Sequence, residues 1–352
     1  MEPKINLSFD RFTNNLKKPI RCMQYKEAYV MDYDPAIELS ETQEDVFWTA
    51  KEIAVEKDVH DIMVNMTEAE RHGVITVLKL FTKYEIEAGD SWWGRKVQEM
   101  FPRPCIMRMA NCFSFIETNV HAPFYNKLNE ALHINTEEFY MSYKDDKTLD
   151  DRMQFIRNIM KTDDPMIATA LFAMIEGVVL YSSFAFLKHF QSKGKNKLLN
   201  VVRGINFSVR DEQVHLLGDV FLYKTVYDEL KQNSIDLDAF EKAIKQNQEL
   251  IIQAAKEIYA HEEYVVDMIF ESGSIEGITE KQMKNFIQSR INEILNMLDI
   301  KPIFKVTYNP IADWFYDGIN SYQLHDFFTG IGNQYNRDWD ESRFVWVQGE
   351  LE

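Results

Sequence analysis

Apolar residues recur at spacings of three and four along most of the chain, which is the pattern of amphipathic α-helices. No run of strand-like alternation between apolar and polar residues is long. Turn signals separate the helical stretches, for example FPRP at 101–104 and KTDDP at 161–165. The predicted helices cover 67–97, 104–132, 148–162, 165–191, 195–227, 236–270 and 279–298. The chain is therefore predicted to be all-α.

The helical segments follow one another without a repeat, a low-complexity tract or a clean linker. We therefore expect a single domain over residues 1–352, with a peripheral N-terminal segment at 1–43 and a C-terminal tail at about 338–352. The 67–97 helix has a defined start, because Thr67 and Glu70 have the spacing of a capping box.

The segment PMIATALFAMIEGVVLYSSFAFLKHF, at 165–190, is long and apolar enough to span a bilayer. Glu176 lies near its middle, and a carboxylate in the centre of a membrane is unfavourable. The flanking sequence is rich in charge, and no second segment of this kind exists. We interpret the segment as a helix buried on all sides in a protein that does not cross a membrane. Glu176 is then a buried carboxylate, which requires a partner.

Composition narrows the classes of function. The chain has 352 residues, 45% of them hydrophobic, and a formal net charge of −17. Such an acidic chain is not expected to bind nucleic acid, which usually requires a basic face. The three cysteines, Cys22, Cys105 and Cys112, show no spacing typical of a disulfide framework or a zinc site, as expected of a reduced protein. The N-terminal residues contain no apolar signal core, so we expect a cytoplasmic location.

Candidate metal ligands lie on four of the predicted helices, as two Glu/His pairs and two single glutamates. The members of each pair are three or four residues apart, which places both side chains on one helix face. This combination is the ligand inventory of a di-iron or di-manganese carboxylate bundle. Carboxylates neutralise the two cations and each imidazole caps one of them. The candidate ligands are Glu85, Glu117, His121, Glu176, Glu212 and His215.

Other carboxylates and histidines compete with this set. Glu257 and His261 have the same spacing as the 117/121 pair, but the charged residues around them indicate a solvated face. Glu87 and Asp90 are alternatives to Glu85, which helix register favours only modestly. The remaining histidines lack a matching carboxylate on an apolar face and are interpreted as surface or structural residues: His60, His72, His133, His189 and His325.

Several motifs resemble the small, radical-generating subunit of class I ribonucleotide reductase. FWTAKEIAVEKDVHD, at 47–61, resembles the family's tryptophan-bearing entry segment, and VLKLFTKYE resembles its first ligand helix, which selects Glu85. IEGVVLYSSFAF places Glu176, and SVRDEQVHLLGD places Glu212 and His215. HDFFTGIGNQYNR, at 325–337, resembles the run before the flexible tail. The resemblance, from about residue 44 to 337, implies a ferritin-like helical bundle with a four-helix di-metal core and extra helices.

The resemblance also implies roles for residues that are not metal ligands. Tyr125 follows His121 by four residues, as the radical tyrosine does in the family. Trp48 corresponds to the tryptophan that passes an electron to the site, and Asp211 to the aspartate that links this tryptophan to the histidine. Tyr335 corresponds to the tail tyrosine that relays the radical to a separate large subunit. The implied enzyme is a ribonucleoside-diphosphate reductase, active only when the large subunit is present. In it the dinuclear metal site activates an oxygen species, and the resulting oxidising equivalent is passed to the large subunit for reduction of ribonucleotides to deoxyribonucleotides.

The chain departs from the family pattern at two places. The first ligand pair is usually Glu-x-x-His, whereas Glu117 and His121 are four residues apart. Pro123 follows closely and cannot donate a hydrogen bond to the carbonyl of Asn119, so we expect a kink or a π-bulge here. Leu180 stands where many members of the family have a phenylalanine beside the radical.

Other properties stay open at this point. The metals are expected to be two iron ions, two manganese ions or one of each, with a flavodoxin-like activator if the site uses manganese. The oxidant is stored either on Tyr125 or on the metal pair. Two other functions share the fold: a self-contained di-metal ligand-binding oxidase or monooxygenase, which would not need Tyr335, and a ferritin-like iron store. The family further implies a homodimer.

Overall fold

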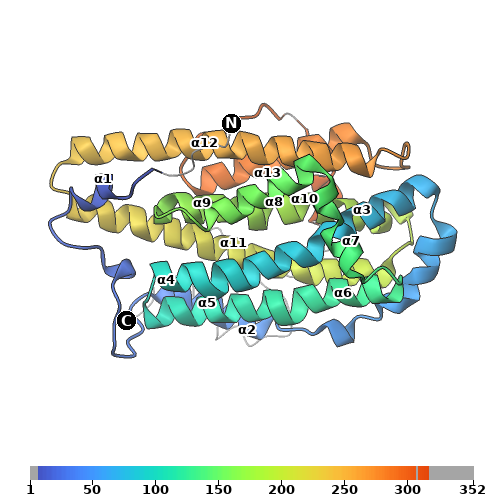
Figure 1. Cartoon of the computed structure of the whole chain (residues 1–352), viewed down its shortest axis with the longest axis horizontal. Helices are drawn as coiled ribbons and strands as arrows, with labels where there is room; N and C mark the ends of the chain where they lie inside the picture. The colour runs from blue at the N-terminus through green and yellow to red at the C-terminus, as the bar shows by residue number, and fades with distance from the viewer. Residues whose placement is uncertain (1–6, 307, 317–352) are drawn as a thin grey trace, which may run out of the picture.

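The structure, a computed structural model, describes residues 7–306 and 308–316, and within these ranges it contains helices but no strands. An isolated bridge pairs Leu16 with Ser234. The long helices run side by side along the longest axis of the molecule (Figure 1). The all-α prediction is therefore confirmed.

The α-helices of the described residues are α1 (Asp10–Thr13), α2 (Asp34–Asp45), α3 (Glu68–Ile86), α4 (Val97–Met100), α5 (Pro104–Ile116), α6 (Ala122–Ala131), α7 (Glu137–Met141), α8 (Lys147–Ile159), α9 (Pro165–Met174), α10 (Leu180–Lys188), α11 (Leu199–Asn233), α12 (Leu237–Ile269), α13 (Glu280–Met297) and α14 (Ala312–Phe315). The π-helical segments are η4 (Asp61–Asn65), η5 (Glu87–Lys96), η6 (Glu117–His121) and η8 (Ile175–Val179). The 3₁₀ turns are η1 (Arg21–Met23), η2 (Ala50–Glu52), η3 (Val55–Asp58), η7 (Ser142–Asp145) and η9 (His189–Gly194).

Four long helical rods form the core. The first consists of α3, η5 and α4, the second of α5, η6 and α6, the third of α9, η8 and α10, and the fourth is α11. Helix α11 packs against α9, α5 packs against η5, and α3 packs against α6. Helices α12 and α13 pack on the third rod, and α2 packs on α5 and α11. Leu39 and Gln43 of α2 are buried, so this part of the 1–43 segment belongs to the packed structure.

Local signals explain where the helices begin. The Thr67 hydroxyl accepts a hydrogen bond from the Glu70 backbone N–H, and the Glu70 carboxylate accepts one from the Thr67 N–H. This is the predicted capping box at the start of α3. Helix α9 begins with Pro165, and the Asp164 carboxylate accepts hydrogen bonds from the next two free N–H groups.

Three of the four rods contain π-helical turns. The bulge expected near Pro123 is confirmed, because the Ala122 N–H bonds to the Glu117 carbonyl five residues back. The predicted helices over 67–97 and 165–191 are present, but each contains a π-helical segment, η5 or η8, that the sequence analysis did not predict. Neither of these two segments contains a proline, so no local signal of that kind marks them. All three turns contain a candidate ligand or begin within two residues of one, and π-bulges are frequent at functional sites.

The apolar helical stretch Pro165–Ser192 is enclosed by the rest of the chain. Among the described residues it is the one helix that is long and apolar enough to cross a membrane by length and composition. Its most hydrophobic window is entirely buried, and Glu176 is fully buried within it. Its neighbours include α11, α12 and α13. The stretch therefore lies in the interior of the bundle.

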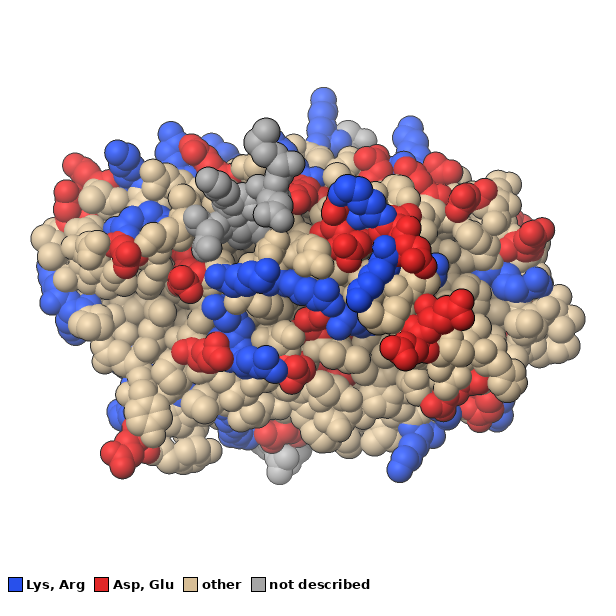
Figure 2. Space-filling model, in the orientation of Figure 1, with Lys and Arg blue, Asp and Glu red and all other residues tan. Residues whose placement is uncertain are grey.

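Charged side chains are scattered over one face of the bundle. On the face seen in Figure 2, acidic and basic side chains lie intermixed, and a row of basic groups crosses its middle. The polar sides of the amphipathic helices face solvent here, while their apolar sides meet in the core.

Candidate metal centre

Six fully buried side chains from the four rods converge on one small volume. They form two overlapping groups whose potential ligand atoms lie within 4.8 Å of one another: Glu85, Glu117, His121 and Glu212, here called the His121 half, and Glu117, Glu176, Glu212 and His215, here called the His215 half. The structure thus brings all six predicted ligands together. Glu117 and Glu212 belong to both halves, which is the position of carboxylates that bridge two ions.

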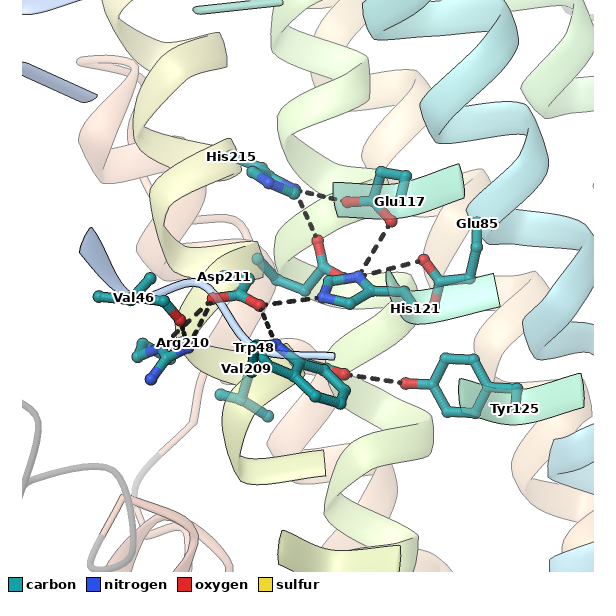
Figure 3. A network of polar contacts seen from close by, with 12 residues as sticks. Val46, Trp48, Glu85, Glu117, His121, Tyr125, Val209, Arg210, Asp211 and His215 are labelled. Carbon is teal, nitrogen blue, oxygen red and sulfur yellow. Dashed lines mark hydrogen bonds and ion pairs between the residues drawn. The ribbon is translucent and has the colours of Figure 1, made fainter. Parts of the chain in front are cut away.

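Both histidines point Nδ1 into the carboxylate cluster. His121 Nδ1 lies 3.1 Å from Glu117 Oε2 and 3.1 Å from Glu212 Oε1. The same nitrogen lies 3.7 Å from Glu85 Oε2. His215 Nδ1 lies 2.5 Å from Glu117 Oε1 and 3.2 Å from Glu212 Oε2. The shared carboxylates therefore contact both imidazoles, one from each half (Figure 3).

Close packing of the rods makes this convergence feasible. Gly89 of η5 faces the second rod, and a Cβ atom at this glycine would lie 2.7 Å from the Glu117 Cβ. Any side chain here would push the two rods apart. On the opposite side, Arg290 of α13 donates from Nε to the Gly177 carbonyl at 2.9 Å. This bond holds the π-helical backbone next to Glu176.

The charges of the cluster interact strongly. Burial raises the pKa of Glu85 and Glu176 well above the usual range, and neighbouring carboxylates raise both further. Burial also acts to raise the pKa of Glu117, but the two imidazoles outweigh it and hold that pKa well below the usual range. Burial lowers the pKa of His121 and His215, yet the carboxylates reverse this, and the pKa of His215 rises to about 9. Protons therefore balance part of the negative charge when cations do not.

The cluster also offers more buried oxygen atoms than the protein has donors for. Both carboxylate oxygens of Glu85 and one of Glu176 are buried without a hydrogen-bond partner. Carboxylate oxygens in this state are unfavourable unless a cation meets them. Carboxylate oxygens combined with two imidazole nitrogens suit iron and manganese. The residues therefore fit a pair of divalent ions.

Asp211 connects His121 to Trp48 and Arg210. Its Oδ2 lies 3.1 Å from His121 Nε2 and accepts a hydrogen bond of 2.6 Å from Trp48 Nε1 (Figure 3). Its Oδ1 accepts hydrogen bonds from Arg210, which also donates to the Val46 carbonyl. Burial acts to raise the pKa of Asp211, but Arg210 and His121 outweigh it and lower that pKa. An ionised Asp211 fixes the His121 ring with Nδ1 towards the cluster.

Tyr125 is fully buried, one helical turn beyond the histidine of the second rod. Its ring stacks on Phe81, with centroids 4.3 Å apart and planes inclined by 4°, and Phe81 stacks in turn on Phe184. Its hydroxyl donates to Ser208 Oγ at 3.4 Å. Burial and the nearby Glu85 raise the pKa of Tyr125 well above its usual range. The phenol is therefore neutral and enclosed by an apolar wall.

Comparisons with known proteins agree with this geometry. Residues 26–310 match the family model described as "Ribonucleotide reductase, small chain". The chain belongs to this family. A probable ribonucleoside-diphosphate reductase small subunit of Invertebrate iridescent virus 3 is 24% identical over 88% of this chain and 85% of its own length. The ribonucleoside-diphosphate reductase 2 subunit beta of Escherichia coli is 26% identical over 63% of this chain and 66% of its own length.

Solved structures share the fold of this small chain. The dimanganese(II)-NrdF of Streptococcus sanguinis matches with a TM-score of 0.67 and 20% identity, over 84% of this chain and 100% of that one. A putative class I ribonucleotide reductase from Bacillus halodurans also has a TM-score of 0.67 and 20% identity, over 81% and 100% of the two chains. The expected ferritin-like helical bundle is therefore confirmed.

The small chain contains site residues that the sequence analysis did not single out. Trp93 donates from Nε1 to Glu176 Oε1 at 2.9 Å, and Trp92 donates from Nε1 to Asp219 Oδ1 at 3.0 Å. Asp219 is fully buried. Burial raises its pKa well above the usual range, whereas the Trp92 bond and the charge of His215 lower it. Two features of the sequence could have pointed to these residues: the two adjacent tryptophans, and an aspartate one helical turn after His215.

The alternatives to Glu85 lie outside the cluster. Glu87 pairs with Lys83 and Arg157 at the edge of the first rod. Asp90 pairs with Arg95 on the surface. The helix register therefore turns Glu85, and neither rival, towards the other rods.

The pair Glu257 and His261 belongs to neither ligand group. The interpretation of its surroundings as a solvated face was wrong for Glu262, which is fully buried. Glu262 forms an ion pair with Arg152 and accepts a hydrogen bond from Ser182 at 2.6 Å. A helix packed on several sides buries more of its polar positions than periodicity alone indicates.

Of the histidines interpreted as surface or structural, His189 is buried, with Nδ1 next to the Phe186 carbonyl. This is a structural position at the start of η9, directly after the third rod. Tyr335 and His325 lie outside the described residues.

Proposed function

We propose that this chain is the small subunit of a class I ribonucleotide reductase, which stores an oxidising equivalent and passes it to a separate large subunit. The observation that carries the proposal is the hydrogen-bonded connection from Trp48 through Asp211 to His121, at one end of a two-ion ligand set. The ligand set alone would suit other di-metal proteins of this fold. The relatives described above are named as small or beta subunits of ribonucleoside-diphosphate reductases, which supports the same activity.

In this proposal Glu117 and Glu212, which belong to both halves, would serve both metal ions, and the remaining Glu/His pair of each half would complete the ligands of one ion. Bound iron or manganese supplies the redox chemistry that these side chains lack. The ions are two iron, two manganese or one of each. The Streptococcus sanguinis neighbour is named as a dimanganese protein, which makes manganese a direct candidate. A flavodoxin-like activator is proposed only for the manganese case.

We assign the storage of the oxidising equivalent to Tyr125. The phenol is neutral, so its oxidation removes a proton together with the electron, and its hydroxyl already donates to Ser208. Phe81 stacks on the ring, with Phe184 stacked against Phe81, and this apolar packing keeps water and reductants away from the phenol. Burial of this tyrosine therefore serves the lifetime of a radical as well as packing.

Trp48 is the proposed exit for the oxidising equivalent. Its indole N–H and the His121 ring share one oxygen of Asp211, so a continuous hydrogen-bonded path joins tryptophan and ligand. Trp48 is buried, whereas its neighbour Phe47 is exposed, so the path ends close to the surface. We extend the proposal to Tyr335 as the relay to the large subunit, to a homodimer and to a cytoplasmic location, which the family resemblance implies.

The test is reconstitution of the full chain with Fe(II) and dioxygen, or with Mn(II), dioxygen and the flavodoxin-like activator, followed by assays with and without a ribonucleotide reductase large subunit from the same source. We expect two ions per chain, reduction of ribonucleoside diphosphates only in the mixture, and a tyrosyl radical signal that is lost in Tyr125→Phe. Reduction by the isolated chain, or full activity after removal of the residues beyond 320, would overturn the proposal. Activity retained in Tyr125→Phe would move the stored oxidant to the metals.

A further inference from the structure

The two candidate ligand histidines differ at the ring nitrogen that faces away from the carboxylates. Nε2 of His121 meets the Asp211 carboxylate at 3.1 Å. Nε2 of His215 is buried and has no hydrogen-bond partner among the described residues. A metal-ligating histidine almost always donates its second N–H to a carboxylate, a carbonyl or a water. His121 thus has a carboxylate partner at Nε2, whereas Nε2 of His215 has none among the described residues.

Asp219 offers the missing acceptor. It follows His215 by four residues on α11, so both side chains lie on the same helix face. Trp92 donates to Asp219 Oδ1 at 3.0 Å and fixes the orientation of the carboxylate. Oδ2 of the same carboxylate is buried without a partner. One unpaired donor and one unpaired acceptor thus lie one helical turn apart in the interior, where unpaired polar atoms are unfavourable.

We infer that Asp219 is a positioning residue for His215, which it contacts at Nε2 through one bridging water, and that Trp92 holds it in place. The inference rests on the proposed function, because it requires His215 to bind a metal ion. The water accepts a hydrogen bond from His215 Nε2–H and donates one to Asp219 Oδ2. The buried donor and the buried acceptor are then both satisfied. A buried water bound to two such polar groups is ordinary in protein interiors.

The consequence is a fixed tautomer. With the proton held on Nε2, His215 Nδ1 keeps its lone pair for an ion in the His215 half. Asp211 has the same effect on His121, but by direct contact. The alternative is that Asp219 serves only as the hydrogen-bond partner of Trp92, in which case its replacement would lower stability and leave metal affinity unchanged.

The test uses the full chain with Asp219→Asn, which keeps the shape of the side chain and an oxygen for Trp92. Trp92→Phe is the second variant. Asp164→Asn is the matched control, because Asp164 is equally buried but is bonded to Arg11 and Asn247 at the start of α9. Mn(II) titration of metal-free protein gives the two affinities. Anomalous diffraction at the manganese edge, on crystals with limiting Mn(II), gives the occupancy of each position.

We expect Asp219→Asn to weaken binding in the His215 half roughly 10- to 100-fold and to leave the other ion unchanged. Trp92→Phe should weaken the same position by less, and Asp164→Asn should change neither affinity. Thermal unfolding of the metal-free variants separates loss of fold from loss of affinity, and Trp92→Phe decides if Asp219→Asn does not fold. Wild-type affinity at both positions, or equal weakening of both, overturns the inference and leaves the proposed function standing. A wild-type chain that binds fewer than two Mn(II) ions overturns both.

Discussion

The His121 half and the His215 half have the same ligand chemistry but differ in what lies behind their histidines. Asp211 touches a histidine, a tryptophan and the Arg210 guanidinium, and these contacts lower its pKa. Asp219 accepts a hydrogen bond from a tryptophan, and burial raises its pKa. Each half thus has a tryptophan–aspartate pair near its histidine. Among the described residues, only the pair at Asp211 also forms an ion pair, with Arg210.

The two tryptophans also differ in their surroundings. Trp48 adjoins the exposed Phe47 and belongs to the segment between α2 and η2. Trp92 is completely buried and stacks on Phe172, with centroids 4.4 Å apart. Both indoles are buried, so the difference lies in their neighbours: an exposed residue adjoins Trp48, whereas an aromatic ring stacks on Trp92.

The largest expected effect removes the common part of the two halves. Glu117→Gln keeps the volume of the side chain but removes a charge that contacts both imidazoles. We expect the variant to lose both ions in a metal analysis of reconstituted protein, and to lose activity with them. Glu257→Gln, on a helix outside the cluster, is the control and should keep two ions. Two tightly bound ions in Glu117→Gln would show that the halves do not share this carboxylate.

The next effect separates the two tryptophans. Trp48→Phe removes the hydrogen bond to Asp211 and the oxidisable indole, so ribonucleotide reduction should fall close to zero while both ions remain at saturating Mn(II). Trp92→Phe should act on metal affinity in the His215 half. Parallel metal titrations and activity assays with the large subunit compare the two. The comparison fails if Trp48→Phe is fully active, or if both variants lose activity without any change in metal affinity.

Both halves should respond to pH in the same direction, in stability and in Mn(II) affinity. Folding raises the pKa of Glu85, Glu176 and both histidines, so the metal-free folded chain binds more protons than the unfolded chain. Its stability should therefore fall as pH rises from the usual histidine value of 6.5 to the His215 value of about 9. Metal binding must displace these protons, so Mn(II) affinity should rise over the same range.

Thermal unfolding of metal-free protein and Mn(II) titrations at several pH values measure the two trends. They should have opposite signs. A metal affinity that does not change between pH 6.5 and about 9 would contradict the raised pKa of His215.

The smallest effect concerns Tyr125, one helical turn beyond the histidine of the His121 half. Ser208→Ala removes the acceptor of the Tyr125 hydroxyl bond, and the loss of one such bond should lower the free energy of unfolding by about 1 kcal/mol. The tyrosyl radical should remain but show shifted g-values in high-field electron paramagnetic resonance, because they respond to hydrogen bonding. Ser183→Ala on α10 is the control, since it leaves the Tyr125–Ser208 bond in place. An unchanged spectrum in Ser208→Ala would mean that the bond is absent once the radical forms.

The sequence by itself determined the helices, the six candidate ligands and the π-turn at Glu117. Glu117 and His121, like Glu212 and His215, share a face because helix geometry is local and depends only on spacing. Glu176 was identifiable because one carboxylate interrupts a long apolar run. Pro123 predicted the bulge because a residue without an N–H breaks the regular hydrogen-bond pattern.

Only the tertiary structure decided which residues support these ligands. Trp92 and Asp219 are 127 positions apart, Trp93 and Glu176 83, and Arg290 and Gly177 113. Such contacts depend on how the rods are rotated and shifted against one another, and no spacing within a single helix encodes that. The π-turns η5 and η8 and the burial of Glu262 belong to the same class. Each is a response of one helix to the neighbours packed against it, which appear only when the bundle assembles.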